Sequence, residues 1–245
     1  MSGHVRELSL QVTNACRVLA VHGLVDDILG HVSVRVDDDT ILIRSRGPHE
    51  QGLRFTQVSD IQLVTLAGRH SMPDGYAPPN ELALHLAMYA GRPDVRAVVH
   101  AHPPSVVALT LTSRALLPLV GAFNIPGYHL AAAGVPNYPS SALIATPERG
   151  ADVAHTMGSS QACLLTGHGL VTTGSSVPDA VIRALAINSL ADMTMRVLSA
   201  GVEPRPVDPA DAGDLPDLGP SFNQMTVWRY HLARLDELGL LVTSA

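Results

Sequence analysis

Apolar side chains recur at helical spacing near the start of the chain. Leu8, Val12 and Leu19 are separated by four and seven residues, so they fall on one face of a helix. We predict an amphipathic helix over residues 4–22. Gly23 ends it, because glycine is a common stop signal for helices.

Alternation of apolar and polar residues replaces this pattern in the next segment. Residues 31–36 and 40–45 alternate, which predicts two strands, and the aspartates at 37–39 between them predict a hairpin turn. A third strand is expected near 61–66. The run over 95–101 is apolar and rich in β-branched residues, so it predicts a buried strand.

The rest of the chain divides into helices, short strands and loops. Further helices are predicted over residues 81–90, 105–112, 147–158, 178–200 and 221–239. Asn80 is expected to cap the first of these helices. Two more strands are predicted over 162–166 and 170–173, while glycine and proline make 118–146 a region of strands and loops. The pattern indicates an α/β class in which helices cover a mostly antiparallel sheet.

The segment over residues 202–220 breaks this organisation. It holds five prolines and shows no periodicity, which predicts a linker or arm. We therefore divide the chain into a domain over residues 1–201 and a C-terminal part over 202–245. This second part comprises the proline-rich arm and the final helix, which is expected to pack on the same or a neighbouring subunit.

Composition excludes several classes of protein. All 16 basic residues are arginine, so the chain lacks the lysine of a Schiff-base enzyme or a P-loop. The net charge of −6 argues against a nucleic-acid or membrane-surface partner. Cys16 and Cys163 lie far apart in apolar surroundings, which predicts no disulfide framework and fits a reducing cytoplasm. We expect no signal peptide and no transmembrane helix.

Three of the 12 histidines and one glutamate carry the candidate chemistry. His100 and His102 stand two residues apart at the end of a predicted strand, so both imidazoles converge as metal ligands do. His168 lies between two glycines that permit a sharp turn, and Glu81 opens a predicted helix. Each also has an ordinary explanation, as buried histidines at a strand end, as a turn, or as a carboxylate at a helix N-terminus. His85, one turn beyond Glu81, is expected to pack on its helix.

The order and spacing of these residues resemble the class II aldolase/adducin family. The matching segments are Gly30-His31-Val32-Ser33-Val34-Arg35, Asn80-Glu81-Leu82-Ala83-Leu84-His85, Arg92-Pro93-Asp94-Val95, His100-Ala101-His102-Pro103 and Thr166-Gly167-His168-Gly169. The resemblance covers roughly residues 5–200. It implies a single three-layer α/β/α domain and a homotetramer with active sites at subunit interfaces. It also implies one divalent metal ion held by His100, His102 and His168, with Glu81 as fourth ligand, acid/base group or both.

The chain departs from the family's sugar-phosphate aldolases at their phosphate site. Those enzymes use an asparagine in a Gly-Asn-Val-Ser segment, a serine pair before the glutamate, and a Thr-Gly or Ser-Gly turn. Here the corresponding residues are His31, Pro79-Asn80 and Ser45-Arg46-Gly47. A capping or core histidine and a solvated hairpin end remain the plain alternatives for His31 and Arg46. The departures resemble the family members that decarboxylate hydroxylated aromatic dicarboxylates, such as dihydroxyphthalates and hydroxypyridine dicarboxylates.

One metal site is compatible with both reactions. Aldol cleavage and decarboxylation of an ortho-hydroxy acid each need a Lewis acid on an oxygen two bonds from the breaking C–C bond, and a positioned proton donor. Our first hypothesis is a metal-dependent decarboxylase of aromatic catabolism, a carbon–carbon lyase. The second is a sugar-phosphate aldolase of the fuculose or ribulose type, or an epimerase. The third is a non-catalytic interaction module as in the adducins, which would not need the ligands kept here.

The first hypothesis assigns a role to each candidate residue. His31 is the expected proton donor, and Glu81 is a ligand or an acid/base group. The expected substrate-binding residues are Arg46, Ser45, Gly47 and Asn80. Three imidazoles and a carboxylate favour Mn²⁺ or Zn²⁺, with Co²⁺ or Fe²⁺ as alternatives.

The expected partners are a small-molecule substrate and further copies of the chain, with a tetramer favoured. Tyr230 or His231 of the final helix is expected to reach the pocket of an adjacent subunit, with ordinary packing as the alternative. Tyr230 is therefore included among the candidate catalytic residues.

Overall fold

A single sheet forms the centre of the protein, whose computed structural model describes residues 3–112 and 114–243. Within these residues the strand order is β3-β2-β1-β4-β7-β6-β5. The strands are β1 His31–Arg35, β2 Thr40–Arg44, β3 Ile61–Thr65, β4 Ala97–Ala101, β5 Asn137–Tyr138, β6 Ala162–Leu165 and β7 Gly169–Gly174. Neighbouring strands are antiparallel except β5 and β6, which are parallel. The mostly antiparallel sheet predicted from the sequence is therefore confirmed.

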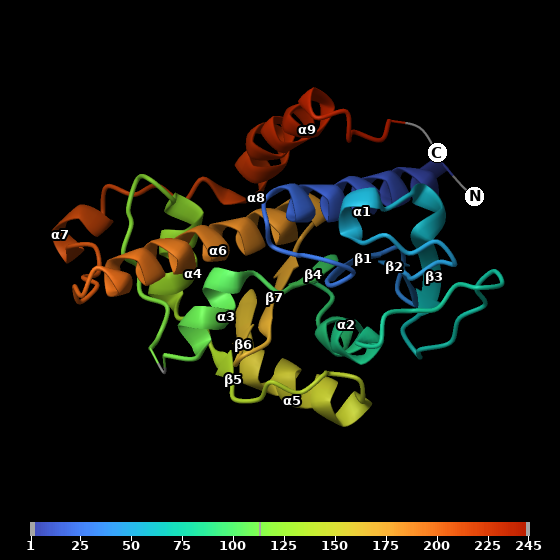
Figure 1. Ribbon diagram of the computed structural model, residues 1–245, viewed down its shortest axis with the longest axis horizontal. Coiled ribbons are helices and arrows are strands. Elements are labelled where there is room, and N and C mark those ends of the chain that lie inside the picture. The colour runs from blue at the N-terminus through green and yellow to red at the C-terminus, as the bar shows by residue number, and fades with distance from the viewer. Residues whose placement is uncertain (1–2, 113, 244–245) are drawn as a thin grey trace.

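Helices cover both faces of this sheet. The helices are α1 Gly3–Val21, α2 Leu82–Tyr89, α3 Pro104–Thr110, α4 Ile125–Ala133, α5 Pro147–Met157, α6 Val177–Ser199, α7 Pro209–Ala212, α8 Gly219–Phe222 and α9 Trp228–Glu237. Figure 1 shows α1 and α6 on one side of the strands and α2 and α5 on the other. The architecture is the three-layer α/β/α arrangement that the resemblance implied.

Alternation along β4 divides the buried apolar side chains between the two faces. Val98 belongs to the core under α2 and α5, together with Leu84 and Val153. Its neighbour Val99 belongs to the core under α1 and α6, together with Ile187. Because successive side chains of a strand point to opposite faces, one apolar strand serves both cores.

The segment over residues 118–146 was predicted to hold strands and loops, and this is wrong in part. It contains α4, whose first turn includes Pro126, and Asn124 caps the helix by accepting a hydrogen bond from the Gly127 amide at 3.0 Å. Proline is compatible with a first helical turn, where no amide donor is needed. The sequence interpretation took Pro126 and Gly127 for breakers, although Asn124 and Pro126 together form a start signal.

The C-terminal part lies against the start of the chain. The arm carries the two short helices α7 and α8, and α9 buries Trp228 and Leu235 in the core that includes α1. Asn14 exchanges two hydrogen bonds with the backbone of Val242, at 2.9 and 3.0 Å. The final helix thus packs on α1 of its own chain (Figure 1). Of the helices described, none has the length and apolarity needed to cross a membrane.

Candidate metal centre and active site

The four predicted metal ligands come together at one end of the sheet. Glu81 precedes α2, His100 lies in β4, His102 follows β4, and His168 lies in the turn between β6 and β7. One ligand atom from each lies within 4.8 Å of all the others. Residues up to 87 positions apart in sequence therefore form one group with the donor set of a transition-metal site.

The hydrogen bonding of His100 tests whether this group fits a cation. Its Nδ1 lies 2.9 Å from the carbonyl oxygen of Leu170, an acceptor, so the neutral ring carries its hydrogen on Nδ1. Its Nε2 then has a lone pair, yet lies 2.8 Å from Nε2 of His102 and 3.1 Å from a carboxylate oxygen of Glu81. The carboxylate oxygen of Glu81 also presents a lone pair, so these two atoms repel each other at this distance, and a shared cation converts the repulsion into attraction. The residues present therefore fit a divalent ion.

The turn that carries His168 depends on both flanking glycines. Gly167 has φ +61°, a conformation that other residues rarely adopt. A Cβ on Gly169 would stand 2.2 Å from the carbonyl oxygen of Ala101, so a side chain there would push β7 away from β4. The small residues on either side thus bring the third imidazole to the end of β4.

Glu81 is held in place from the main chain. One carboxylate oxygen accepts a hydrogen bond from the Ile144 amide at 2.9 Å, and the carboxylate faces His100 and His168. Burial opposes its ionisation, but the imidazoles of His100, His168 and His31 outweigh this and lower the pKa of Glu81 far below its usual range. The group is therefore an anion at neutral pH, as a metal ligand must be.

Asn80 does not cap α2, so that prediction is wrong. The first residue of the helix is Leu82, and Glu81 occupies the cap position without a side-chain hydrogen bond to the helix. The side-chain oxygen Oδ1 of Asn80 instead accepts a hydrogen bond from the guanidinium of Arg46. A charged donor competes successfully with the helix amides for this oxygen.

His31 lies beside the metal group because β1 and β4 are neighbours, with His31 opposite His100 in the register. Its Nε2 is 3.6 Å from a carboxylate oxygen of Glu81. Burial lowers the pKa of His31 to about 4, although Glu81 acts in the opposite direction. At neutral pH His31 is a neutral imidazole with a single N–H.

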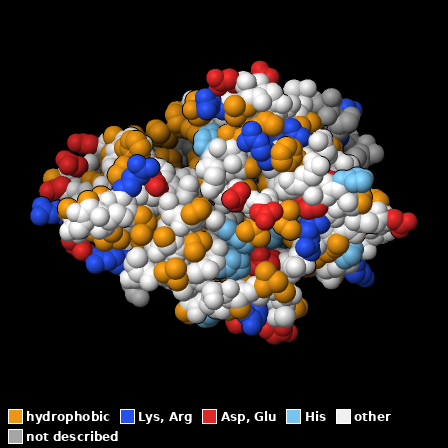
Figure 2. All heavy atoms as spheres, viewed as in Figure 1, with side chains coloured by type: hydrophobic (Ala, Val, Ile, Leu, Met, Phe, Trp, Pro, Cys, Tyr) orange, Lys and Arg blue, Asp and Glu red, His pale blue; other side chains and the backbone are white. Residues whose placement is uncertain are grey.

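A cavity of about 110 Å³ opens onto this group. Its lining includes Ile28, Leu29, Gly30, His31, Arg44, Arg46, Pro79, Asn80, Glu81, His102 and Leu143. Figure 2 shows histidine side chains at the surface near the middle of the face viewed, with hydrophobic side chains around them. The cavity thus combines candidate ligands, a neutral imidazole, two guanidinium groups and apolar walls that suit a ring.

Arg44 is a member of this cavity that the sequence interpretation missed. Its guanidinium is buried and lies 2.5 Å from a carboxylate oxygen of Glu50, a residue that also accepts the Gly52 amide. Burial opposes ionisation of Glu50, but Arg44 and the amide lower its pKa. The sequence did contain a signal for Arg44. It ends β2 two residues before Arg46, so both side chains are expected on the same face of the chain, toward the cavity.

Three further residues were predicted to bind substrate or to act in catalysis: Ser45, Gly47 and Tyr230. Ser45 is buried, and its hydroxyl donates to the Ile43 carbonyl oxygen at 3.3 Å. Gly47 lies close to Tyr76, in a second cavity next to the first. Tyr230 is exposed on α9, and within the described chain no recorded contact joins it to the histidine cluster. The roles assigned to these three residues stay predictions.

Two further histidines have partners within the chain, His85 in addition to its expected packing and His231 in the ordinary packing that the sequence left as an alternative. His85 packs on α2, but it is also bonded to His31 and Ser33, at 2.7 and 2.6 Å. His231 is buried against His22, the residue that follows α1, and Nδ1 of His231 lies 3.1 Å from Nε2 of His22. The spacing of Glu81 and His85, one helical turn, was the signal that could have placed His85 near the site.

The family follows from a match to this chain. Residues 10–195 match the family described as Class II Aldolase and Adducin N-terminal domain. The chain belongs to this family. The resemblance seen in the motifs is thereby confirmed over the metal group and all seven described strands of the sheet.

Curated relatives include enzymes with two different activities. The chain is 48% identical to a 3,4-dihydroxyphthalate decarboxylase of Arthrobacter keyseri, over 90% of this chain and 91% of the relative. It is 43% identical to one of Rhodococcus jostii, over 91% and 93%. An L-fuculose phosphate aldolase of Escherichia coli is 28% identical over 82% of this chain and 88% of the relative. Relatives at this level make the chain a carboxy-lyase.

Solved structures agree on the fold. An aldolase II superfamily protein from Pseudomonas syringae superimposes with a TM-score of 0.83 at 21% identity, covering 98% of this chain and 96% of the other. The predicted fold class is therefore confirmed.

Proposed function

We propose that this chain is a metal-dependent decarboxylase of a hydroxylated aromatic dicarboxylate, with 3,4-dihydroxyphthalate as the substrate. The observation that carries the proposal is the cavity in which His31 and Arg46 adjoin the Glu81 and histidine group. Support for the substrate comes from the relatives of that name, at 43 to 48% identity.

The metal ion would be held by His100, His102, His168 and Glu81. When bound, a divalent ion supplies a Lewis acid that withdraws electrons from the substrate's oxygen atoms. The protein fixes the ligands beforehand, His100 through Leu170 and Glu81 through Ile144.

The reaction removes the carboxylate that is adjacent to a ring hydroxyl. The ring carbon bearing that carboxylate takes up a proton, the C–C bond breaks, and its electron pair returns to the ring as carbon dioxide leaves. One proton is consumed for each carbon dioxide released. We assign delivery of this proton to His31, whose Nε2 faces the carboxylate of Glu81 across 3.6 Å.

The second carboxylate of the substrate needs a cationic partner, and the two arginines differ in their suitability. The charge of Arg44 is already balanced by Glu50. Arg46 is bonded to Asn80, which is neutral. Among the residues that the structure describes, no ion pair involves Arg46, so its guanidinium is available at the cavity to pair with a planar carboxylate.

A sugar-phosphate aldolase is the alternative, because fuculose phosphate aldolases are among the relatives and use the same family fold. A phosphate would also meet Arg46, so geometry alone does not separate the two substrates. The identity of residue 31 favours the first substrate. His31 places a flat, neutral ring where the aldolases have an asparagine, and such a ring suits a flat aromatic substrate.

The finer features of the proposal follow the family resemblance. They are Mn²⁺ or Zn²⁺ as the ion, a cytoplasmic homotetramer with active sites at its interfaces, and a place in aromatic catabolism.

The test of the reaction is a direct comparison of two activities of the metal-loaded enzyme. Carbon dioxide release from 3,4-dihydroxyphthalate, with 3,4-dihydroxybenzoate as product, is expected to exceed cleavage of ketose and aldose phosphates by orders of magnitude. Aldol cleavage at an ordinary enzymatic rate, without decarboxylation of any hydroxy-aromatic diacid, overturns the proposal.

A further inference from the structure

A chain of buried hydrogen bonds leads from His31 away from the metal group. His31 Nδ1 lies 2.7 Å from Nε2 of His85, and Nδ1 of His85 lies 2.6 Å from the hydroxyl of Ser33. The Ser33 hydroxyl in turn lies 2.8 Å from that of Tyr89. Ser33 and His85 are fully buried, and Tyr89 nearly so. None of these three side chains has a part in the reaction as described above.

The strand β1 and the helix α2 supply the side chains of this series of hydrogen bonds. His31 and Ser33 are two residues apart in β1, so they share one face of the strand. His85 and Tyr89 are four residues apart in α2, so they lie one turn apart on one face of the helix. The strand face and the helix face meet, and the hydrogen bonds alternate between them.

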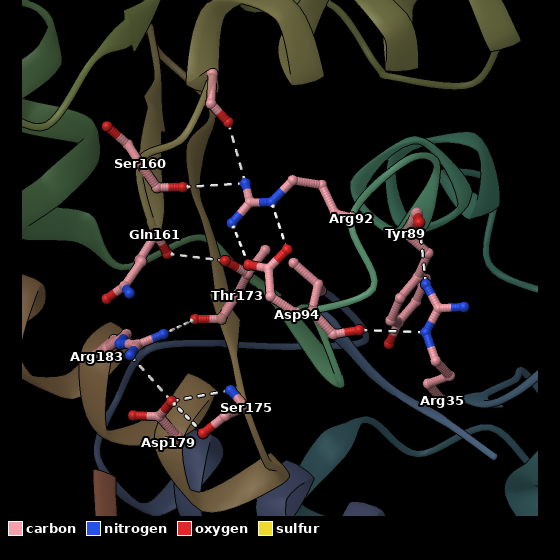
Figure 3. Close-up of polar contacts among 12 residues, drawn as sticks. Arg35, Tyr89, Arg92, Asp94, Ser160, Gln161, Thr173, Ser175, Asp179 and Arg183 are labelled. Carbon is pink, nitrogen blue, oxygen red and sulfur yellow. Dashed lines mark hydrogen bonds and ion pairs between the residues drawn. The ribbon is translucent and has the colours of Figure 1, made fainter. Parts of the chain in front are cut away.

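Tyr89, at the far end, is held rigidly. Figure 3 shows Arg35 beside the ring of Tyr89. The guanidinium donates hydrogen bonds to the carbonyl oxygens of Tyr89 and Val95. These bonds measure 3.0 and 3.2 Å, and the guanidinium carbon lies 5.0 Å from the ring centre. Arg35 lies on the same face of β1 as His31 and Ser33. The same strand therefore carries His31 at one end of the series of hydrogen bonds and the arginine that contacts Tyr89 at the other.

The donors and acceptors along this series of hydrogen bonds can be assigned in one direction, starting from Tyr89. Burial raises the pKa of the Tyr89 phenol, so the group keeps its hydrogen and needs an acceptor for it. Within the described residues, the acceptor available to the phenol is Ser33. Ser33 must then give its own hydrogen to Nδ1 of His85.

The same reasoning about donors and acceptors determines which ring nitrogen of His85 and of His31 carries the hydrogen. Burial lowers the pKa of His85 well below its usual value, so the ring is neutral with one N–H. Because Nδ1 of His85 accepts from Ser33, that hydrogen is on Nε2 and points to Nδ1 of His31. The single hydrogen of His31 must therefore be on Nε2, the atom that faces Glu81 and the cavity.

We propose that Ser33, His85 and Tyr89 are positioning residues that hold His31 in the tautomer with its hydrogen on Nε2. The inference rests on the proposed role of His31. It adds the contacts that make Nε2 of His31 a hydrogen donor rather than an acceptor. When His31 gives up its Nε2 proton, the ring gains negative charge, and the N–H of His85 stabilises that charge at Nδ1. The Nδ1 tautomer would present a lone pair to the substrate and could not deliver a proton.

The sharpest variant is Tyr89→Phe, which removes one hydroxyl and keeps the ring beside Arg35. Ser33 can then turn its hydrogen away from His85, so His31 is expected to become a mixture of tautomers. Nitrogen-15 NMR of the diamagnetic zinc-loaded protein reads the two ring nitrogens of His31, assigned by comparison with His31→Gln. We expect a protonated Nε2 in the wild type and averaged signals in Tyr89→Phe. The value of kcat should fall about 3- to 30-fold with KM little changed, the scale of one lost buried hydrogen bond.

Conservative rescue at His85 gives a second test. The side-chain amide of glutamine places an N–H near the position of Nε2, so His85→Gln should retain the Nε2 tautomer of His31 and more activity than His85→Leu. Tyr128→Phe is the matched control, because Tyr128 is a buried tyrosine of α4 outside the chain of hydrogen bonds. It should leave the NMR signals and kcat unchanged. Metal content and circular dichroism confirm that each variant is folded, and Ser33→Ala replaces Tyr89→Phe if that variant is not.

The outcomes separate this inference from the proposed reaction. Wild-type protein with the His31 hydrogen on Nδ1, or a Tyr89→Phe variant with unchanged signals and kcat, overturns the inference. If no diacid is decarboxylated, the proposed function fails while the NMR measurement still decides the tautomer. If the tautomer is as stated but His31→Gln keeps full kcat, the positioning is real and the assignment of His31 as donor is wrong.

Discussion

His100 is the most constrained side chain of the site. It is fully buried in β4, its Nδ1 is committed to the Leu170 carbonyl, and its Nε2 faces two other potential ligand atoms. The ring can neither turn nor change tautomer without losing the Leu170 bond. A site built around such a residue is organised before a metal ion arrives, which limits the reorganisation that binding requires.

Removal of this imidazole should therefore empty the site. We expect purified wild-type protein to contain about one Zn, Mn, Fe or Co ion per chain, and His100→Ala to lose both the ion and the activity. Elemental analysis after gel filtration measures the first and carbon dioxide release the second. His155→Ala, at an exposed position of α5, is the matched control and should retain both. Full activity of a chelated, metal-free sample would contradict the metal assignment.

Arg46 allows a prediction that depends on the substrate. Arg46→Ala should lower kcat/KM for the diacid ~30- to 1000-fold, because a charge-assisted and bidentate interaction is lost. Mono-acids without the second carboxylate should already react slowly with the intact enzyme and should not respond to the change. Arg46→Lys keeps the charge without the fork and should fall between the two. Arg69→Ala, at an exposed site beyond β3, serves as control; equal losses for diacid and mono-acid would remove Arg46 from carboxylate binding.

At the scale of elements, α2 organises the site from one side. Glu81 stands just before it, and His85 and Tyr89 lie along the face that meets β1. The helix is only eight residues long, so its placement depends on packing against α5 and the sheet more than on its own propensity. Substitutions that shift α2 are therefore expected to affect the carboxylate ligand and the support of His31 together.

The limits of sequence-based prediction also appear at this scale. Strands such as 31–36 were predictable because a single local signal, the alternation of apolar and polar residues, specifies them. The cap by Asn80 was not, because Arg46 reaches Asn80 from 34 residues away and takes its oxygen. His85 was assigned to packing for the same reason: its partner His31 lies on another element. Long-range hydrogen bonds decide such cases, and one sequence does not display them.

The contact between α9 and α1 should depend on pH. Burial lowers the pKa of His231 to about 4, and His22 adds to this effect. The pKa of His22 is itself lowered by burial and by the charge of Arg234. A histidine whose pKa is lower in the folded state favours folding above its ordinary value of about 6.5, and this contribution is lost as the pH falls toward 4. Trp228, the single tryptophan, is buried in this contact. Its emission should shift to the red between pH 6.5 and 4, and His231→Gln should abolish or displace the shift; identical curves would exclude His231 as the cause.

At the scale of the whole molecule, several exposed apolar side chains lie beside the site, and Ile28 and Leu29 of its cavity are among them. Leu143 lines the cavity and is 50% exposed. Leu111 is 67% exposed and would stand 3.5 Å from a Cβ on Gly167, next to His168. A rim of this kind is costly in water, at about 25 cal/mol for each Å² left uncovered. Such a rim is the surface that a neighbouring subunit would cover.

We therefore expect a tetramer whose assembly and activity decline together. Light scattering at micromolar concentration should give the mass of about four chains, and the activity per subunit should fall on dilution along the same curve as dissociation. Leu111→Asp should shift both curves to higher concentration by placing a charge in the interface. Leu63→Asp, at an exposed position on the edge strand β3, is the matched control and should leave both unchanged. A monomer with full activity at micromolar concentration would show that each chain carries a complete site and that the exposed rim has another cause.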